Sequence, residues 1–375
     1  MSLASQRILV IGGGFSGMAA AIELRKLGAA VDLVEIDPGW RSYGAGISLG
    51  GATLRAMRTL GILEAFLREG NAADGVKICL PHGPQVAELP TPRLAGADVP
   101  GGGAILRPVL ARILADATRA AGTHVMLGCT FTSITQDADG VDVGFTDGQR
   151  RRYDLVIGAD GLYSKTREAL FPGAPKPRYS GQACWRAVLP RPPEVSTATM
   201  WMGRVKPGVN PVSKTHMYLF VTEHRPSNEH VDPARFPTLL RELLADFPAP
   251  VVQHIRSQIN EDSQIVFRPL EALLMPRPWS QGRVVLIGDT VHATTPHLAS
   301  GACIGIEDAI VLAEEIARTG AAPDALQAFE ARRWERCRMV VENSLRLGEI
   351  EIAGGDKDEH GRIMRESLMA LAQPV

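Results

Sequence analysis

Several marks of other protein classes are missing from this sequence. Its five cysteines are odd in number, widely spaced and never in a C-x-x-C pair, which argues against a disulfide framework, a zinc site or a dithiol reductase. They are Cys79, Cys129, Cys184, Cys303 and Cys337. Apolar runs such as Arg283–Gly288 are far too short to span a bilayer, and the N-terminus shows no cleavage signal. We therefore expect a cytoplasmic protein without a bound metal.

An excess of charge of either sign is missing as well. The 40 basic side chains are balanced by 41 acidic ones, so no overall field would concentrate the protein on nucleic acid or on an anionic membrane. This balance favours a small-molecule partner. With 375 residues, of which 45% are hydrophobic, the chain is expected to form one large composite α/β domain or two intertwined ones.

The first motif that is present lies near the N-terminus. A short apolar run over residues 7–11 leads into the loop Gly12-Gly13-Gly14-Phe15-Ser16-Gly17, and helical spacing follows over residues 18–27. The first glycine of a G-x-G-x-x-G loop permits the tight turn, the second lets backbone approach a pyrophosphate, and the third lets helix pack on strand. The free N–H groups of the helix start then face the phosphates.

A second strand, residues 31–35, completes this β-α-β unit and ends in Glu35, eighteen residues after Gly17. A carboxylate at this position can accept both hydroxyls of an adenosine ribose. A glycine-rich turn without a ligand is the alternative for the loop alone. The added packing positions and Glu35 favour a dinucleotide site.

Two later strand ends carry acidic residues. The apolar strand 153–158 runs into Asp160-Gly161, which on its own favours an ordinary strand-to-helix joint over a ligand site. The strand 283–287 runs into Gly288-Asp289, and Pro296-His297 and Gly301-Ala302-Cys303 follow. Asp289 is placed to bind a ribityl or ribose hydroxyl. The start of the next helix can stabilise negative charge on a reduced flavin ring.

These three segments in this order resemble the class A flavoprotein aromatic hydroxylases, the para-hydroxybenzoate and salicylate hydroxylase family, over essentially the whole chain. Residues 44–47, Arg107 at the start of a helix, residues 279–289 and Glu307-Asp308 add to the likeness. The sequence departs from the family at Thr290 and Val291, at Ser300 and at residues 50–52. None of these changes removes a side chain that FAD requires, but they leave the ring substrate open.

The resemblance implies an α/β fold with a Rossmann-like FAD-binding domain, an inserted antiparallel β-sheet substrate domain and C-terminal helices. Proline-rich turns and alternating runs between residues 171 and 278 are typical of that inserted sheet. We expect residues 1–75, 101–178 and 268–320 to form the FAD-binding domain. Residues 76–100 and 179–267 are expected to form the substrate layer, and residues 321–375 a C-terminal helical region.

The resemblance also assigns residues to FAD, with Arg41 as a candidate contact for the phosphates of NADH or NADPH; a solvated loop cation is the alternative there. The expected FAD residues are Gly12, Gly14, Ser16, Gly17, Glu35, Ile36, Arg41, Arg107, Asp160, Asp289, Pro296, Ala299, Ser300, Gly301, Ala302 and Cys303. Its implied activity is that of a single-component monooxygenase, in which NAD(P)H reduces FAD and a flavin C4a-hydroperoxide hydroxylates a small aromatic or heteroaromatic ring. The implied partners are that aromatic substrate and oxygen, and the implied assembly is a monomer or a homodimer.

Catalytic and substrate residues are less sharply indicated. Pro296 is expected beside the flavin ring, and His297 is a candidate acid–base group because imidazole titrates near working pH. His292 is interpreted as a buried structural histidine. Arg186, Trp201, His216 and Tyr218 are the candidate substrate contacts in the β-rich layer, although such residues also commonly pack a sheet or pair within the fold.

Three other functions compete with that of a monooxygenase. A flavin-dependent halogenase would need a Trp-x-Trp-x-Ile-Pro segment, which the sequence lacks. A flavin-bound sensor gains no support, because no regulatory or DNA-binding appendage is present. A FAD-dependent reductase or dehydrogenase that does not use oxygen productively remains the main alternative to a monooxygenase.

Overall fold

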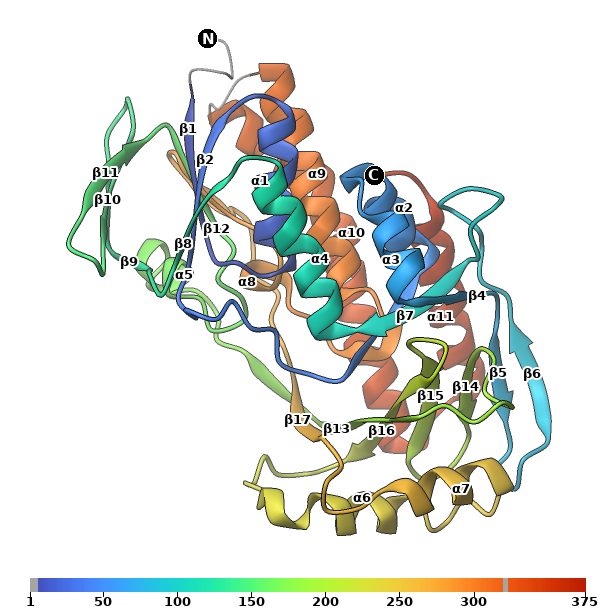
Figure 1. Ribbon diagram of the computed structural model, residues 1–375. Helices are drawn as coiled ribbons and strands as arrows, with labels where there is room; N and C mark the ends of the chain where they lie inside the picture. Colours follow the sequence, from blue (N-terminus) through green and yellow to red (C-terminus); the bar gives the residue numbers. More distant parts are fainter. Residues whose placement is uncertain (1–5, 320–322) are drawn as a thin grey trace.

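The structure is a computed structural model that describes residues 6–319 and 323–375 (Figure 1). A six-stranded sheet carries the expected β-α-β opening, in the order β18-β19-β12-β1-β2-β8. All of its pairings are parallel except that of β18 with β19. Its strands are β1 (Arg7–Ile11), β2 (Ala30–Glu35), β8 (His124–Leu127), β12 (Leu155–Gly158), β18 (Ser280–Gln281) and β19 (Val284–Leu286).

Both faces of this sheet are covered, which explains why its strands read as continuous apolar runs. Alternate residues of β1 face opposite sides: Ile8 and Val10 pack in the helical core, whereas Leu9 and Ile11 pack against a three-stranded sheet. That small sheet has the order β11-β10-β9. The strands are β9 (Phe131–Gln136), β10 (Val141–Phe145) and β11 (Arg150–Tyr153). The helices in this part are α1 (Phe15–Lys26), α4 (Arg107–Ala120), α5 (Lys165–Leu170) and α9 (Gly301–Thr319).

A second large sheet lies below the first in the view of Figure 1, in the order β17-β13-β16-β15-β14-β5-β6. All of its pairings are antiparallel except that of β14 with β5. One face is covered by α6 (Phe236–Leu243) and α7 (Pro250–Gln258), with a core of their own. The strands are β5 (Val76–Cys79), β6 (Gln85–Leu89), β13 (Arg178–Pro190), β14 (Ala198–Trp201), β15 (Lys206–Pro211), β16 (His216–His224) and β17 (Ile265–Ala272).

A small antiparallel sheet of order β3-β7-β4 lies between the two large ones, and its Ala104 packs with Val212 and Tyr218 of the second sheet. Two long helices close the chain: α10 packs against α9, and α11 packs against α10 (Figure 1). The remaining elements are β3 (Gly46–Gly50), β4 (Asn71–Ala73), β7 (Gly102–Leu106), α2 (Gly51–Leu60), α3 (Leu63–Glu69), α8 (Asp289–His292), α10 (Pro323–Ala353), α11 (Lys357–Ala372) and the 3-10 turns η2 (Pro233–Arg235) and η3 (Pro296–Leu298).

The fold class predicted from the sequence is confirmed, and three local predictions need correction. The helical spacing of residues 52–67 predicts a single helix, but the structure has two, because Gly61 adopts a left-handed φ of 83° and ends α2. The amphipathic pattern of residues 305–318 predicts a helix from Gly305, whereas α9 begins four residues earlier, at Gly301. Helices α6 and α7 were not predicted, since prolines at the first turn of each read as turn signals.

Candidate active site

The glycine loop has the geometry that a pyrophosphate site requires. Gly12 has a φ of 106°, and a Cβ there would lie 2.4 Å from the carbonyl oxygen of Ala159. A Cβ on Gly17 would lie 2.0 Å from the carbonyl oxygen of Gly12. A Cβ on Gly14 would meet no atom within 4 Å. The outer glycines are therefore required by packing, while the middle one borders open space at the start of α1.

Glu35 is held in place by backbone N–H groups. Its Oε2 accepts the N–H of Gly13 at 2.8 Å, and its Oε1 accepts the N–H of Asp37 at 2.8 Å. The Trp40 indole donates to the carbonyl oxygen of Gly13 at 2.8 Å, which fixes the loop from the other side. An ionised carboxylate offers about four acceptor sites, so Glu35 retains capacity for two hydroxyl groups.

Asp160 has a structural role in the protein. Its Oδ1 accepts the Ser164 hydroxyl at 2.5 Å, and its Oδ2 accepts the N–H and hydroxyl of Thr166 at 2.9 and 3.0 Å. These bonds satisfy groups at the start of α5 that a helix leaves unpaired. The geometry thus supports the strand-to-helix joint, the alternative that the sequence left open. Contact of this carboxylate with FAD remains a prediction.

Thr290, one of the departures from the family pattern, links the second motif to the third. Its hydroxyl accepts the N–H of Gly161 at 3.1 Å, and its carbonyl oxygen accepts Arg167 Nη1 at 2.7 Å. The substitution therefore supplies a contact between two strand ends of the nucleotide-binding sheet.

Asp289 follows Gly288, whose φ of 64° starts the short helix α8. The Asp289 side chain reaches solvent, yet the protein around it raises the pKa of its carboxyl above the ordinary value, while His292 and Arg107 act in the opposite direction. Because its side chain is exposed, water screens this desolvation, and the carboxylate stays accessible at the candidate active-site cleft.

Arg107 faces Asp289 across this cleft. Its guanidinium carbon lies 4.9 Å from the centre of the Phe15 ring, and it makes no hydrogen bond or ion pair with any residue that the structure describes. Desolvation lowers its pKa, Asp289 raises it, and Arg186 on the second sheet lowers it further. Arg107 is therefore close enough to both Asp289 and Arg186 to interact with each of them electrostatically.

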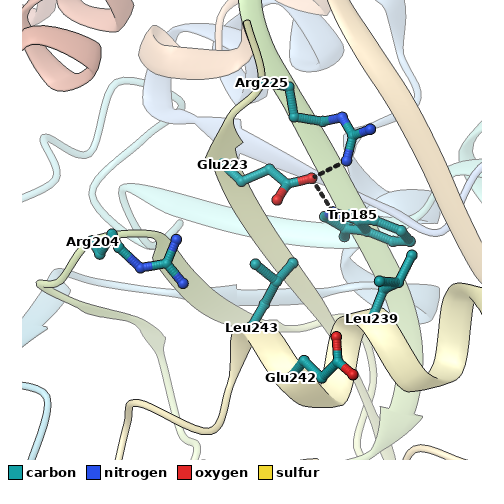
Figure 2. Close-up of a pocket in the computed structure, with 7 residues that line it drawn as sticks. All are labelled: Trp185, Arg204, Glu223, Arg225, Leu239, Glu242 and Leu243. Atoms are coloured by element: carbon teal, nitrogen blue, oxygen red, sulfur yellow. Dashed lines mark hydrogen bonds and ion pairs between the residues drawn. The ribbon is translucent and has the colours of Figure 1, made fainter. Parts of the chain in front are cut away.

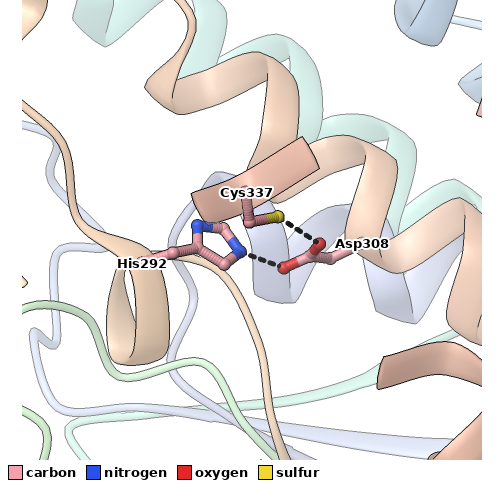
Figure 3. Close-up of side chains that lie close together, drawn as sticks. All are labelled: His292, Asp308 and Cys337. Atoms are coloured by element: carbon pink, nitrogen blue, oxygen red, sulfur yellow. Dashed lines mark hydrogen bonds and ion pairs between the residues drawn. The ribbon is translucent and has the colours of Figure 1, made fainter. Parts of the chain in front are cut away.

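A buried ion cluster lies beneath the Gly288-Asp289 turn (Figure 3). Asp308 Oδ2 accepts the N–H of Gly288 at 2.9 Å and lies 2.5 Å from His292 Nε2, while Oδ1 accepts Arg333 Nε at 2.7 Å. Burial would raise the pKa of Asp308, but His292 and Arg333 hold it at about 2. Burial would lower the pKa of His292, but Asp308 raises it well above the ordinary value. His292 is therefore structural, as the sequence indicated.

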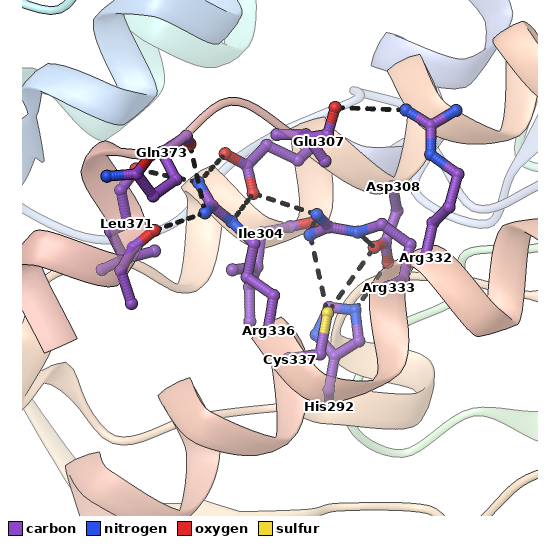
Figure 4. A network of polar contacts seen from close by, with 12 residues as sticks. His292, Ile304, Glu307, Asp308, Arg332, Arg333, Arg336, Cys337, Leu371 and Gln373 are labelled. Atoms are coloured by element: carbon purple, nitrogen blue, oxygen red, sulfur yellow. Dashed lines mark hydrogen bonds and ion pairs between the residues drawn. The ribbon is translucent and has the colours of Figure 1, made fainter.

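The cluster extends to the C-terminal helices (Figure 4). Arg333 Nη1 lies 3.2 Å from Glu307 Oε2, and Arg336 Nη2 lies 2.7 Å from Glu307 Oε1. Arg336 also donates to the carbonyl oxygen of Leu371 at 2.9 Å, at the end of α11. The turn that presents Asp289 is thus supported by α9, α10 and α11.

His292, Asp308 and Cys337 bring ligand-type atoms within 4.8 Å of one another, but they do not form a metal site. The imidazole and carboxylate are already in direct hydrogen-bond contact at 2.5 Å. The other carboxylate oxygen binds the Arg333 guanidinium, whose Nη2 also lies 3.5 Å from Cys337 Sγ. A cation would have to share this space with a permanent positive charge, so the geometry is that of an ion cluster.

The segment between α8 and α9 presents backbone to solvent. Pro296 and Ala299 are exposed, Gly301 and Ala302 are half-buried at the start of α9, and Ala299 adopts a left-handed φ of 48°. Ser300 and Cys303 are buried; the Ser300 hydroxyl donates to the carbonyl oxygen of Leu298 at 2.7 Å, and burial raises the pKa of the Cys303 thiol. Side-chain contact with a ligand is therefore not supported for Ser300 or Cys303, whose role would be through backbone.

His297 faces helix α10 and is 6% exposed. Its Nδ1 lies 2.9 Å from Thr295 Oγ1, and its Nε2 lies 3.5 Å from Glu351 Oε2. Glu351 also pairs with Lys206 and lies 3.1 Å from His360. Burial would raise the pKa of Glu351, but hydrogen bonds from the two histidines and the charge of Lys206 hold it well below the ordinary value.

The second sheet turns the face that carries Arg186 toward the nucleotide-binding sheet. Arg186 pairs across strands with Phe220 on one side and with Val266 on the other. Nearby, the Tyr218 hydroxyl lies 2.6 Å from Ser48 Oγ, which accepts Asn210 Nδ2 at 3.1 Å. Arg186 makes no hydrogen bond or ion pair among the described residues. Burial raises the pKa of Tyr218, which keeps its hydroxyl protonated.

Other predicted residues lie elsewhere. Trp201 is buried in the core under α6 and α7, on the face opposite Arg186, so it does not line the cleft. Trp185 lies on that same far face, beside a cavity of about 180 Å³ with Leu239 and Leu243 of α6 (Figure 2). His216 stands exposed at the start of β16 and contacts Thr215 Oγ1 at 2.9 Å.

Three predicted cofactor residues lie on the first helix and the loop after β2. Ile36 is 70% exposed, and Arg41 is held by Asp37 through a contact of 2.9 Å. Ser16, on α1, packs against Gly288 and against Gly305 of α9, since a Cβ on either glycine would lie 2.3 Å from its hydroxyl. Of the functional residues that sequence reasoning missed, Ser48 and Asn210 gave no signal in the chain. Asp308 was noted only as part of the family likeness.

Comparison with known proteins places this geometry in a family. Residues 5–344 match the family model described as FAD binding domain. Aurachin C monooxygenase/isomerase of Stigmatella aurantiaca is 33% identical over 97% of this chain and 94% of its own length. The 2-heptyl-3-hydroxy-4(1H)-quinolone synthase of Pseudomonas aeruginosa is 31% identical over 92% of this chain and 89% of its own. The structure of Klebsiella pneumoniae HpxO with FAD and uric acid superposes with a TM-score of 0.83 at 25% identity, covering 100% of this chain and 94% of HpxO.

The chain therefore belongs to the class A FAD-dependent aromatic hydroxylases. It is an FAD-dependent oxidoreductase, and FAD is its cofactor. Among the helices of residues 6–319 and 323–375, none is long and apolar enough to cross a membrane.

Proposed function

We propose that this protein uses NADH or NADPH and oxygen to hydroxylate a small aromatic or heteroaromatic ring. The observation that carries the proposal is the group formed by Asp289, Arg107 and Arg186, in which an accessible acid and two arginines without hydrogen-bond partners meet between the two large sheets. Unpaired guanidinium groups in a partly dry cleft favour anionic or electron-rich ligands. When bound, FAD would accept electrons from the nicotinamide and activate oxygen.

The residues present fit FAD in this cleft. Gly14 and the start of α1 offer free N–H groups and open space to the pyrophosphate, and Glu35 has acceptor capacity for the ribose. Asp289 can accept a ribityl hydroxyl, and Arg107 can neutralise phosphate or ring charge. The backbone around Pro296 and Ala299, at the start of α9, would lie along the ring and favour negative charge on it.

Arg186 is the proposed contact for an anionic oxygen of the substrate. Phe220 beside it offers an aromatic wall, and the Ser48, Tyr218 and Asn210 side chains offer a hydrogen-bonding edge. The bound ring would exclude water from the oxygen-reactive side of the cofactor, as a productive hydroxylation requires. His297 stays the candidate acid–base group, and its Nε2 lies 3.5 Å from Glu351 Oε2.

The deciding experiment is a screen of hydroxybenzoates, hydroxynicotinates and 4-quinolones with the purified holoenzyme. Consumption of NAD(P)H and of oxygen is recorded together with product mass and hydrogen peroxide. We expect at least one ring compound to accelerate NAD(P)H oxidation and to yield hydroxylated product in equal amount. Release of peroxide alone with every ring compound would favour the reductase alternative. Cytoplasmic localisation and a monomeric or homodimeric state remain predictions.

A further inference from the structure

A second cleft, of about 760 Å³, opens beside the candidate active site. One wall is formed by residues 42–44 and Pro108 of the nucleotide-binding part. The other is formed by residues 228–236 and by the edge strand β17. Its volume lies in the range of about 300–1,000 Å³ that is usual for small-molecule sites. None of the site residues discussed above lines it.

The cleft has an apolar floor and a polar rim. Its less exposed lining side chains are apolar except for Ser42, namely Val231, Phe236, Ile265, Val266, Phe267 and Pro269. The polar ones, Asn228, Glu229, His230, Gln264 and Arg268, are all exposed. This arrangement removes an apolar ligand from water and leaves the polar groups hydrated.

The cleft is continuous with the candidate active site on both walls. On the sheet wall, Val266 pairs directly with Arg186 across neighbouring strands, so their side chains lie on the same face. On the other wall, Gly44 and Pro108 both contact or flank Arg107; a Cβ on Gly44 would lie 3.0 Å from Arg107 Cδ. A substituent on a ring bound at Arg186 would pass Val266 at the edge of the sheet to reach the apolar floor, whose Phe236 and Phe267 pack with Trp185 on the other face.

We propose that the cleft binds an apolar tail, an alkyl or prenyl chain, carried by the aromatic substrate. This inference rests on the proposed function and names the substrate class more narrowly. The lining does not suit the diphosphate of a dinucleotide, because Arg268 is its only arginine or lysine and Glu229 opposes that charge. Arg41, on the adjoining loop, is already paired with Asp37.

The test compares 2-methyl-4-quinolone with 2-heptyl-4-quinolone as substrates and as ligands in calorimetric titrations of the holoenzyme. Each buried methylene is worth about 0.8 kcal/mol, which is about fourfold in affinity. With part of the tail exposed, we expect kcat/KM and affinity to be at least tenfold higher for the heptyl compound. Val266→Asp should remove most of this difference; because its carboxylate can also pair with Arg186, the quantity compared is the ratio of kcat/KM between the heptyl and methyl compounds.

Matched variants keep the result interpretable. Val266→Thr preserves side-chain shape and should lose part of the difference, and Val86→Asp places the same charge on the exposed strand β6, where no effect is expected. FAD content and melting temperature confirm that each variant folds. If Val266→Asp proves unstable, the Val266→Thr result decides.

Four outcomes separate the hypotheses. Turnover of both quinolones without preference for the heptyl compound would overturn the tail site alone. Tight binding of the heptyl compound without hydroxylation would support the tail site and overturn the proposed function. A rise in the KM for NAD(P)H with either substrate in Val266→Asp would assign the cleft to the nicotinamide donor and overturn the inference. Failure of the heptyl compound to bind would also overturn it.

Discussion

At the scale of single residues, the Asp289 carboxylate is exposed although protein surrounds it, so it is expected to contribute to FAD binding. A hydrogen bond to a charged group contributes about 1.5–3 kcal/mol, so Asp289→Ala should weaken FAD binding about ten- to hundredfold. The measurement is the FAD dissociation constant from flavin fluorescence. Asp98→Ala is the control, because the Asp98 side chain is 82% exposed and remote from the cleft. Full FAD retention in Asp289→Ala would remove this acid from the site.

Arg186 should act on the substrate and leave the cofactor unaffected. Arg186→Met keeps the length of the side chain and removes the charge. We expect KM for an anionic ring substrate to rise at least tenfold, about 1.4 kcal/mol, with unchanged FAD content. Arg186→Lys should restore part of the affinity. A loss of FAD in Arg186→Met, with normal KM, would instead place the guanidinium on the cofactor.

At the scale of elements, the glycine loop gives two variants that separate folding from cofactor binding. Gly17→Ala would place its Cβ 2.0 Å from the Gly12 carbonyl oxygen, and overpacking of this kind costs about 1–3 kcal/mol. Its melting temperature without FAD should fall. Gly14→Ala meets nothing within 4 Å and should melt normally but bind FAD at least tenfold more weakly. Equal melting temperatures and equal FAD affinity for both variants would contradict this interpretation of the loop.

The ion cluster under the Gly288-Asp289 turn predicts a stability window in pH. The pKa of Asp308 is lowered to about 2 in the folded state, so its contribution is present above the unfolded pKa of about 3.9 and is lost as pH falls toward 2. The pKa of His292 is raised, so its contribution is full below about 6.5 and is lost as pH rises through the raised value. Stability from this pair should therefore be greatest between about pH 4 and 6.5.

Asp308→Asn tests this window. Removal of one partner of a buried pair costs about 3–5 kcal/mol, so the melting temperature should fall sharply and its decline below pH 4 should flatten. Thermal unfolding of the FAD-free protein, recorded from pH 3 to 9, gives both quantities. Asp98→Asn serves as the exposed counterpart and should reproduce the native profile. If the melting temperature of Asp308→Asn still fell below pH 4 as in the native protein, other carboxylates would control the loss of stability in acid.

Elements that rest on local signals were predictable. The β-α-β opening and the hairpin of β9 and β10 follow from apolar period and turn residues that lie within a few positions of one another. The faces of the second sheet were not predictable in this way. Trp201 and Tyr218 belong to strands of similar character, and only the pairing register with β15 and β13 decides that Trp201 faces α6 and α7 while Tyr218 faces Ser48.

At the scale of the whole molecule, the candidate site exists only where two sheets meet. The Tyr218 hydroxyl and Ser48 Oγ, 2.6 Å apart, join the small sheet β3-β7-β4 to the second large sheet. Tyr218→Phe should cost about 1 kcal/mol of stability and should raise substrate KM more than it changes FAD affinity. Chemical unfolding and steady-state kinetics measure the two effects. A loss of FAD affinity larger than the rise in KM would indicate that this bond serves the cofactor.

Because the site is built from distant parts of the chain, only the residues that follow a local strand pattern could be predicted. Glu35 and Asp289 stand directly after strands of a familiar parallel sheet, where the carboxyl ends of strands meet. Ser48 meets Asn210, and Glu351 meets Lys206, from distant parts of the chain, and no local pattern marks these pairs.

The buried support of the Asp289 turn bears on how the protein is made. Gly12 to Gly17 are synthesised more than 300 residues before Arg333 and Arg336. Until α10 emerges, Asp308 lacks the guanidinium that neutralises it beneath the turn. We therefore expect FAD to load only after α10 has been made, and chains truncated before α10 to accumulate without the cofactor.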